Sequence, residues 1–192
     1  MLTQLSTIKS RLNIDEFDVK NDALLASAIQ AVSARFDNEC NRTLGRSVDL
    51  AHEFPADETE LRVLCYPVEA VTKFELKRNE SDGWFELSGI DYLIRRNCVI
   101  SLNQTLGNWR EQARVIYTGG YALPGSPVTI GQAALPDDLE QAAVEQVTYW
   151  FQNRDHPGVI RQWPKGGIYQ QFLDLDLLPT VKATLEHYQR KN

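Results

Sequence analysis

The apolar positions of the chain have a helical period at its two ends and a strand period in its middle. Within residues 21–45 they recur at steps of four, three, four and four, the spacing of one helix face, and they are Leu25, Ile29, Val32, Phe36 and Cys40. Leu24 and Ala28 are expected to widen this stripe, and Gly45 lies where a left-handed residue often ends a helix. A shorter helix is predicted over residues 3–12.

Residues 47–121 alternate apolar and polar positions with a period of two. The pairs that share a face in each run are Leu61 and Val63, Phe74 and Leu76, Ile100 and Leu102, and Val115 and Tyr117. Turn-forming sequences such as Ser81-Asp82-Gly83 separate the runs. Short alternating runs with frequent turns predict an antiparallel meander or a small sandwich.

The helical period returns after Pro136, where Asp137 and Glu140 have the spacing of a capping box. Residues 153–176 are irregular and rich in glycine and proline, and a last helix is expected to begin at Pro179.

These periods predict an α+β protein. Residues 1–46 and 134–192 are expected to form one helical bundle, because each end has a single apolar stripe that must be covered. Residues 47–133 are expected to form an antiparallel β insertion between the two helical parts.

Composition narrows the class of protein. The chain has 192 residues, 43% of them hydrophobic and 24% charged, which is enough to build an ordinary globular core. The net charge of −6 disfavours autonomous DNA binding, since that binding depends on neutralising phosphates. The three scattered cysteines and the absence of a signal-like or membrane-length apolar run favour a soluble intracellular protein with free thiols.

The candidate chemistry is sparse. Gly119-Gly120 lies between a strand and a helix, where phosphate loops occur, but "TGGYALPG" lacks the spacing of such a loop. His52, His156 and His187 belong to no catalytic or metal motif. We therefore predict no catalytic residue, no metal and no cofactor, and we expect that the protein is not an enzyme. Two alternatives stay open: a small enzyme with a site in loop 153–176, and a monomeric binding module that uses an exposed β-sheet face.

Five sequence segments together resemble one family. They are "DALLASAIQAVSARFDNECNRTLG", "LRVLCYPVEAVTKFEL", "ARVIYTGGY", "LPDDLEQAAVEQVTYWFQNRD" and "LLPTVKATLEHYQ". In this order they resemble the head–tail connector proteins, also called adaptor or head-completion proteins, of long-tailed bacteriophages and gene transfer agents. The shared motifs are structural, and none of them is a catalytic signature.

The resemblance implies a role in the virion neck, after assembly in the host cytoplasm. It implies a ring, typically twelvefold, that lies beneath the portal, extends the DNA channel and offers a surface for tail attachment. The implied partners are other copies of the chain, the portal protein and a tail or stopper protein. The genome would pass through without sequence-specific binding, and no membrane is involved.

The last part of the chain is the expected contact with the portal or the neighbouring subunit. The irregular segment after Asn153 combines a tryptophan with basic residues, a composition typical of interface anchors. The residues predicted for this interface are Arg161, Trp163, Lys165, Tyr188 and Arg190.

Overall fold

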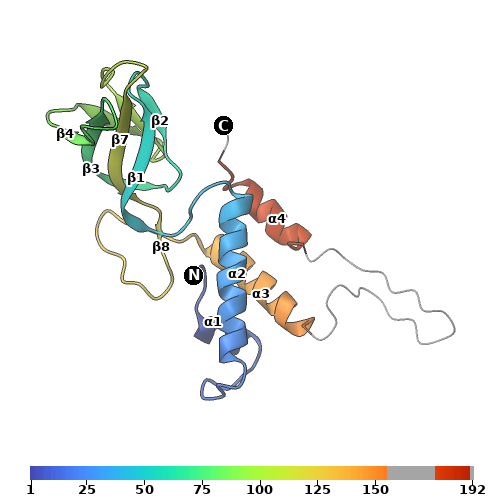
Figure 1. Cartoon of the computed structure of the whole chain (residues 1–192). Helices are drawn as coiled ribbons and strands as arrows, with labels where there is room; N and C mark the ends of the chain where they lie inside the picture. The colour runs from blue at the N-terminus through green and yellow to red at the C-terminus, as the bar shows by residue number, and fades with distance from the viewer. Residues whose placement is uncertain (155–175, 191–192) are drawn as a thin grey trace. The chain divides into compact units, whose positions relative to one another are not determined.

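The computed structural model describes residues 1–154 and 176–190 and divides the chain into two compact units. Met1–Cys40 and Pro136–Asn192 form the helical unit, and Asn41–Leu135 form the β unit (Figure 1). The predicted α+β class is confirmed, because helices from the two ends of the chain pack together and the antiparallel β part lies between them in the sequence. Among the described residues, no helix has the length and apolar character to cross a membrane.

The described residues of the helical unit form four helices: α1 (Leu5–Arg11), α2 (Asp22–Glu39), α3 (Asp137–Gln152) and α4 (Pro179–Glu186). Helix α3 contacts each of the other three. The most deeply buried core residues are at most 1% exposed, and they include Leu25, Ile29, Val32, Phe36, Leu139, Val147, Val181 and Leu185. The stripes predicted from the sequence are therefore the faces that the helices bury, and α4 is part of this core.

The end of α2 differs from the prediction. The helix ends at Glu39, and the residue in the left-handed region is Asn41, with φ of 49°, and not Gly45. Asparagine tolerates this conformation better than most residues, so no glycine is required there. Leu24 does not widen the buried stripe either, because 49% of it is exposed.

The predicted capping box at the start of α3 is also wrong. Pro136 is the N-cap residue, and it has no side-chain acceptor for a cap. Two acidic side chains of the first turn make other hydrogen bonds. Asp138 Oδ1 accepts one from the backbone N of Leu139 at 2.9 Å, and Glu140 Oε1 accepts one from the Thr3 hydroxyl at 3.5 Å. Glu140 thus joins the N-terminal segment to α3.

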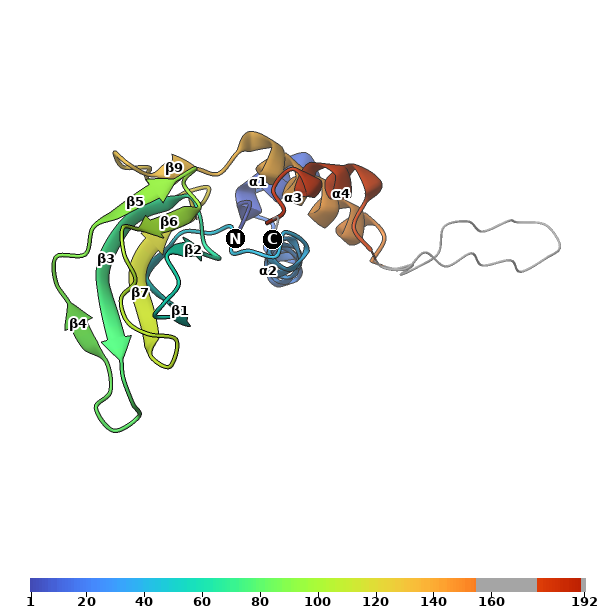
Figure 2. The same ribbon diagram turned by 90° about the horizontal axis from the view of Figure 1, so that it is seen from above.

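The β unit contains two antiparallel sheets (Figure 2). The four-stranded sheet has the order β1 (Ser47–Pro55), β7 (Gln112–Gly119), β3 (Val68–Lys77) and β4 (Phe85–Leu87). The three-stranded sheet has the order β2 (Glu60–Arg62), β6 (Val99–Leu102) and β5 (Tyr92–Arg95), and β8 (Tyr121–Ala122) pairs with β9 (Ala133–Ala134) in parallel.

A single core lies between the two sheets. It includes Phe54, Leu61, Phe74, Leu76, Ile100, Val115 and Tyr117. The arrangement is a small sandwich and not a meander, because β7 pairs with β1 and with β3, far away in the sequence.

The Gly119-Gly120 pair at the end of β7 has a steric role. A Cβ atom on Gly119 would lie 2.6 Å from the carbonyl oxygen of Cys65. Gly120 has φ of +99°, and a Cβ atom there would lie 2.6 Å from the carbonyl oxygen of Gly45. Both glycines allow backbones to approach closely, which explains a motif that resembles a phosphate loop only in its composition.

A partly buried ion cluster lies on the four-stranded sheet. The Glu75 side chain is 8% exposed, its Oε1 is 2.9 Å from Lys73 Nζ, and its Oε2 accepts a hydrogen bond from Arg114 Nε. The hydrogen bond from Arg114 is the largest of the effects that lower the pKa of Glu75. A carboxylate whose pKa falls on folding stabilises the folded state fully at pH values above its unfolded pKa, about 4.3. This stabilisation is lost as the pH falls through the folded pKa.

We expect Glu75→Gln to lower the free energy of unfolding by about 1–3 kcal/mol at pH 7, because it removes a charged partner from both cations. The loss should shrink at acid pH, below the lowered folded pKa of Glu75, where the wild-type carboxyl is also protonated. Urea unfolding at the two pH values measures this. Glu80→Gln is the matched control, since the Glu80 side chain is 91% exposed and its loss should matter little. An equal loss at both pH values would contradict the electrostatic explanation.

Candidate assembly interface

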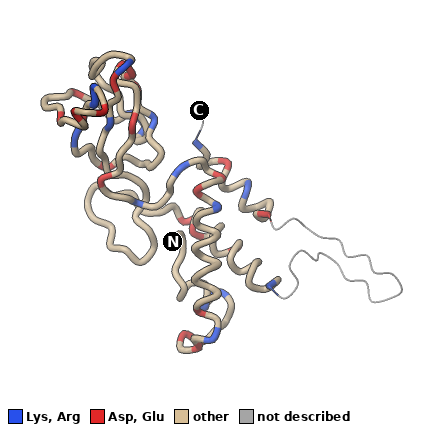
Figure 3. The backbone as a smooth tube through the Cα atoms, viewed as in Figure 1, with Lys and Arg blue, Asp and Glu red and all other residues tan. Residues whose placement is uncertain are grey.

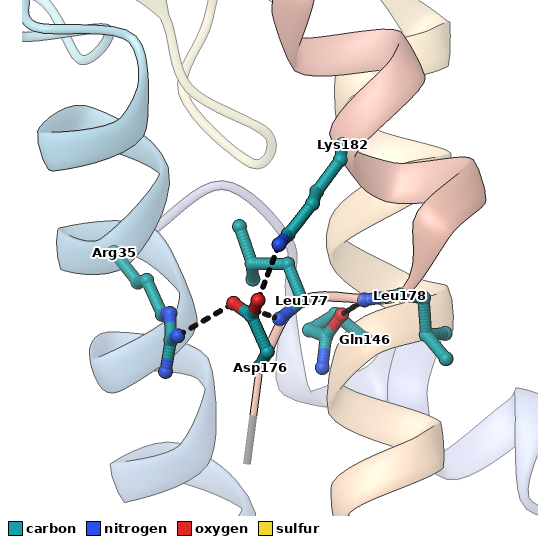
Figure 4. A network of polar contacts seen from close by, with 6 residues as sticks. All are labelled: Arg35, Gln146, Asp176, Leu177, Leu178 and Lys182. Carbon is teal, nitrogen blue, oxygen red and sulfur yellow. Dashed lines mark hydrogen bonds and ion pairs between the residues drawn. The ribbon is translucent and has the colours of Figure 1, made fainter. Parts of the chain in front are cut away.

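Asp176 is the first described residue after segment 155–175, and it is held by two helices (Figure 4). Its Oδ1 accepts hydrogen bonds from Arg35 Nη2 of α2 and from the backbone N of Leu177, each at 2.8 Å. Its Oδ2 binds Lys182 of α4. Lys182, followed by the Leu177 amide, lowers the pKa of Asp176, so the carboxylate stays charged and ties the start of α4 to α2.

Gln146 supports the same point from α3. Its side chain is fully buried, and its Oε1 accepts a hydrogen bond from Leu178 N at 2.8 Å, directly before Pro179 (Figure 4). At the other end of the segment, Arg154 Nη1 donates to the carbonyl oxygen of Phe151 at 2.7 Å, and its guanidinium lies 4.1 Å from the Phe151 ring centroid. The chain therefore leaves α3 and returns to α4 at well-defined positions.

Two of the five predicted interface residues are described, and both make contacts inside the helical unit. The Tyr188 hydroxyl lies 2.7 and 2.9 Å from the two carboxylate oxygens of Asp138. The backbone N of Arg190 donates to the carbonyl oxygen of Cys40 at 2.9 Å. Both side chains are half-buried. The other three, Arg161, Trp163 and Lys165, lie outside the described residues.

Sequence reasoning missed Asp176 and Gln146. The alternation in "LDLDLL" predicts a solvated face for Asp176, and a glutamine on a helix is unremarkable. The only feature of the sequence that could have pointed to them is that both lie near the irregular segment. Their partners lie on other helices, and the sequence does not show which residues those are.

The β unit has a mixed surface charge. Residues 41–135 contain ten basic and twelve acidic residues, and Figure 3 shows both signs interspersed over this unit. Residues 121–135 contain no charged residue at all. A surface of this kind is poorly suited to capturing DNA, which requires a concentration of Lys and Arg.

The resolved pKa shifts all belong to ion pairs. Besides Glu75 and Asp176, the Arg46–Glu69 pair on the β unit, with 2.7 Å between Nε and Oε2, lowers the pKa of Glu69. Within residues 1–154 and 176–190 there is no group of three or more His, Cys, Asp and Glu side chains that could hold a metal. Most of loop 153–176, the site of the enzyme alternative, lies outside the described residues.

The comparison with family models agrees with the resemblance seen in the sequence. Residues 2–84 match the family described as "Phage gp6-like head-tail connector protein". Over these 83 of its 192 residues, the chain is similar to the phage gp6-like head–tail connector family. The match covers α1, α2 and strands β1 to β3, and it includes the first two of the five segments that predicted it.

Solved structures extend the likeness beyond residues 2–84. A chain in the "Neck of empty GTA particle computed with C6 symmetry" matches with a TM-score of 0.60 at 15% identity, over 97% of this chain and 89% of that one. A chain in the "Neck of native GTA particle computed with C12 symmetry" matches with 0.54 at 15%, over 92% and 87%. A third match, to the "Virion of native gene transfer agent (GTA) particle", has 0.53 at 15%, over 89% and 79%.

At 15% identity these matches show a shared fold. Their coverage of 89–97% of this chain extends well beyond the residues that the family model matches. No curated protein matches the chain in sequence.

Proposed function

We propose that this protein is a head–tail connector that forms a ring in the neck of a tailed phage or gene transfer agent particle, between the portal and the tail. The observation that carries the proposal is the family match over residues 2–84 together with the fold of neck components over 97% of the chain. The C6 and C12 symmetries of the similar necks support a ring of about twelve copies, in which one face of each subunit meets a different face of the next.

In this role the ring extends the DNA channel and presents a surface for tail or stopper proteins, without catalysis. The net charge of −6 per subunit and the mixed charge of the β unit support a conduit that lets DNA slide without capture. Images of portal rings incubated with the protein test the proposal. We expect stacked rings, and a stable twofold dimer under every condition, including with portal present, would contradict it.

We further propose that segment 153–176 and the adjoining α4 end contact the portal or the neighbouring subunit. The interface residues would be Arg161, Trp163, Lys165, Tyr188 and Arg190. The contacts at Arg154 and Asp176 support this proposal because they hold both ends of the segment on the helical unit. Since Val181 and Leu185 of α4 are fully buried, α4 would anchor the segment and would not itself leave the core.

Trp163→Ala should weaken binding to portal-containing heads by roughly tenfold or more, the effect of losing an aromatic hot spot. The melting temperature should change little. Sedimentation of the protein with purified heads measures binding, and Gln162→Ala is the control within the same segment. Unchanged head binding would refute the assignment, and a large drop in melting temperature would show that Trp163 belongs to the core instead.

A further inference from the structure

The connection between β6 and β7 presents an exposed tryptophan stacked with an arginine. Trp109 is 71% exposed, and the Arg110 guanidinium carbon lies 4.9 Å from its ring centroid. No carboxylate of the described residues is paired with Arg110. Tryptophan and arginine are the residues most enriched at binding hot spots, so this pair is suited to a protein contact.

Hydrogen bonds hold this turn, residues 107–111, in one conformation; we name it the Trp109 turn. Glu111 Oε2 accepts hydrogen bonds from the backbone N and the side-chain Nδ2 of Asn108, at 2.9 and 2.8 Å. Asn108 Oδ1 accepts one from Arg110 N at 3.0 Å, and Gly107 N donates to the Ala56 carbonyl at 3.0 Å. A turn that is already ordered loses little conformational entropy on binding, so more of the contact energy of Trp109 is retained.

The same β unit carries a groove of complementary character at β5, the edge strand of the three-stranded sheet. Its volume is about 480 Å³, and its lining residues are Asp91, Tyr92, Leu93, Arg95, Ser101, Leu102 and Asn103. Leu93 is 65% exposed and Tyr92 is 37% exposed, which leaves apolar surface uncovered. Pockets of roughly 300–1,000 Å³ accept drug-sized groups, so an indole ring fits within this volume.

The charges in the groove are also complementary to those of the Trp109 turn. No cation of the described ranges is paired with the Asp91 carboxylate, whereas Arg95 Nη1 is already 3.2 Å from Glu60 Oε1. The groove thus has an apolar surface beside the Asp91 carboxylate, which has no cationic partner among the described residues. The Trp109 turn has an indole ring beside the Arg110 guanidinium, which has no carboxylate partner among them. The two surfaces share no residue, so one copy can present its turn and use its groove at the same time.

We propose that Trp109 of one copy inserts into the β5 groove of a second copy, where Arg110 pairs with Asp91 of that copy. The contact is head-to-tail, because two different surfaces meet, and contacts of this kind form a ring when the rotation between neighbours closes. The proposal rests on the ring function proposed above and names the surfaces through which neighbouring β units meet. A DNA duplex is a poor occupant for the groove or the turn, since it offers no apolar pocket for an indole and would be repelled by Asp91.

The test uses charge reversal in the full chain. Arg110→Asp and Asp91→Arg should each weaken self-association about tenfold or more, because each puts like charges together in the contact. The double variant should recover to within about threefold of wild type. Trp109→Ala should also weaken self-association. Sedimentation velocity at high protein concentration and the number of subunits bound per purified portal ring measure the effect, and thermal melting should show all variants folded.

Mixing the two single variants gives an independent readout. In the mixture every turn can meet a groove of opposite charge, so assembly should return although neither variant assembles alone. Unchanged self-association of the single variants, or no recovery in the double variant and the mixture, would overturn the proposal. It would also be overturned if Arg110→Asp removed only tail attachment, since the turn would then bind another protein.

Portal binding separates this proposal from the proposed function. Variants that bind the portal as isolated subunits but fail to associate with each other would support the β-unit contact and leave the connector role intact. Wild-type protein that neither binds portal rings nor self-associates would overturn both.

Discussion

Replacing Gly120 with alanine should destabilise the β unit by about 2–5 kcal/mol, from the sum of backbone strain and overpacking. The new Cβ atom would lie 2.6 Å from the carbonyl oxygen of Gly45 and 2.8 Å from two backbone atoms of Arg46, at a φ of +99°. These neighbours are main-chain atoms, so no side chain can rotate to make room. A loss of this size is a large part of the stability of an ordinary domain.

Gly131→Ala is the matched control for Gly120→Ala. Gly131 has a similar φ of +92°, but nothing lies within 4 Å of its Cβ position. It should therefore cost only the backbone strain, about 1–3 kcal/mol at most. Denaturant unfolding of both variants measures the difference. Equal losses would show that strain alone, and not the contact between the two segments, explains the need for glycine.

Replacing Phe36 with alanine should destabilise the helical unit by about 3–5 kcal/mol, the usual cost of removing a buried phenylalanine. Phe36 is fully buried on α2, and α2 packs against α3 from the C-terminal part of the chain. The packing of these two helices is therefore expected to depend on the buried face of α2.

Leu24→Ala on the same helix is the control for Phe36→Ala, since Leu24 is 49% exposed and should cost well below 1 kcal/mol. Unfolding followed by the helical circular dichroism signal measures both variants. A loss at Leu24 as large as that at Phe36 would contradict the burial pattern and return Leu24 to the apolar stripe predicted from the sequence.

The proposed connector role is supported unequally along the chain. The family match covers the first helices and strands, whereas the C-terminal helices are linked to neck proteins by fold alone. The portal-contact proposal depends on those C-terminal residues, which is why the Trp163→Ala experiment carries more information than another test of the N-terminal half.

The tryptophans show a limit of prediction from local sequence. Trp163 is predicted as an interface residue because it lies in an irregular segment beside basic residues, whereas the sequence around Trp109 gives no such prediction. Only the tertiary structure shows that Trp109 is 71% exposed, stacked with Arg110 and held by a hydrogen-bonded turn. Exposure depends on which distant segments cover a side chain, and the local sequence does not record this.

The sequence by itself determined the helical and strand periods, and with them the α+β class, because burial of one face imposes a regular spacing on each element. It also determined the start of α4, since proline restricts the backbone locally. Only the tertiary structure decided the pairing of β1 with β7, the anchoring of Asp176 by Arg35 and Lys182, and the close backbone approach at Gly119-Gly120. Each of these joins residues that are distant in the chain or that only folding brings together. A period reports which face of an element is buried, but it does not report which partner buries it.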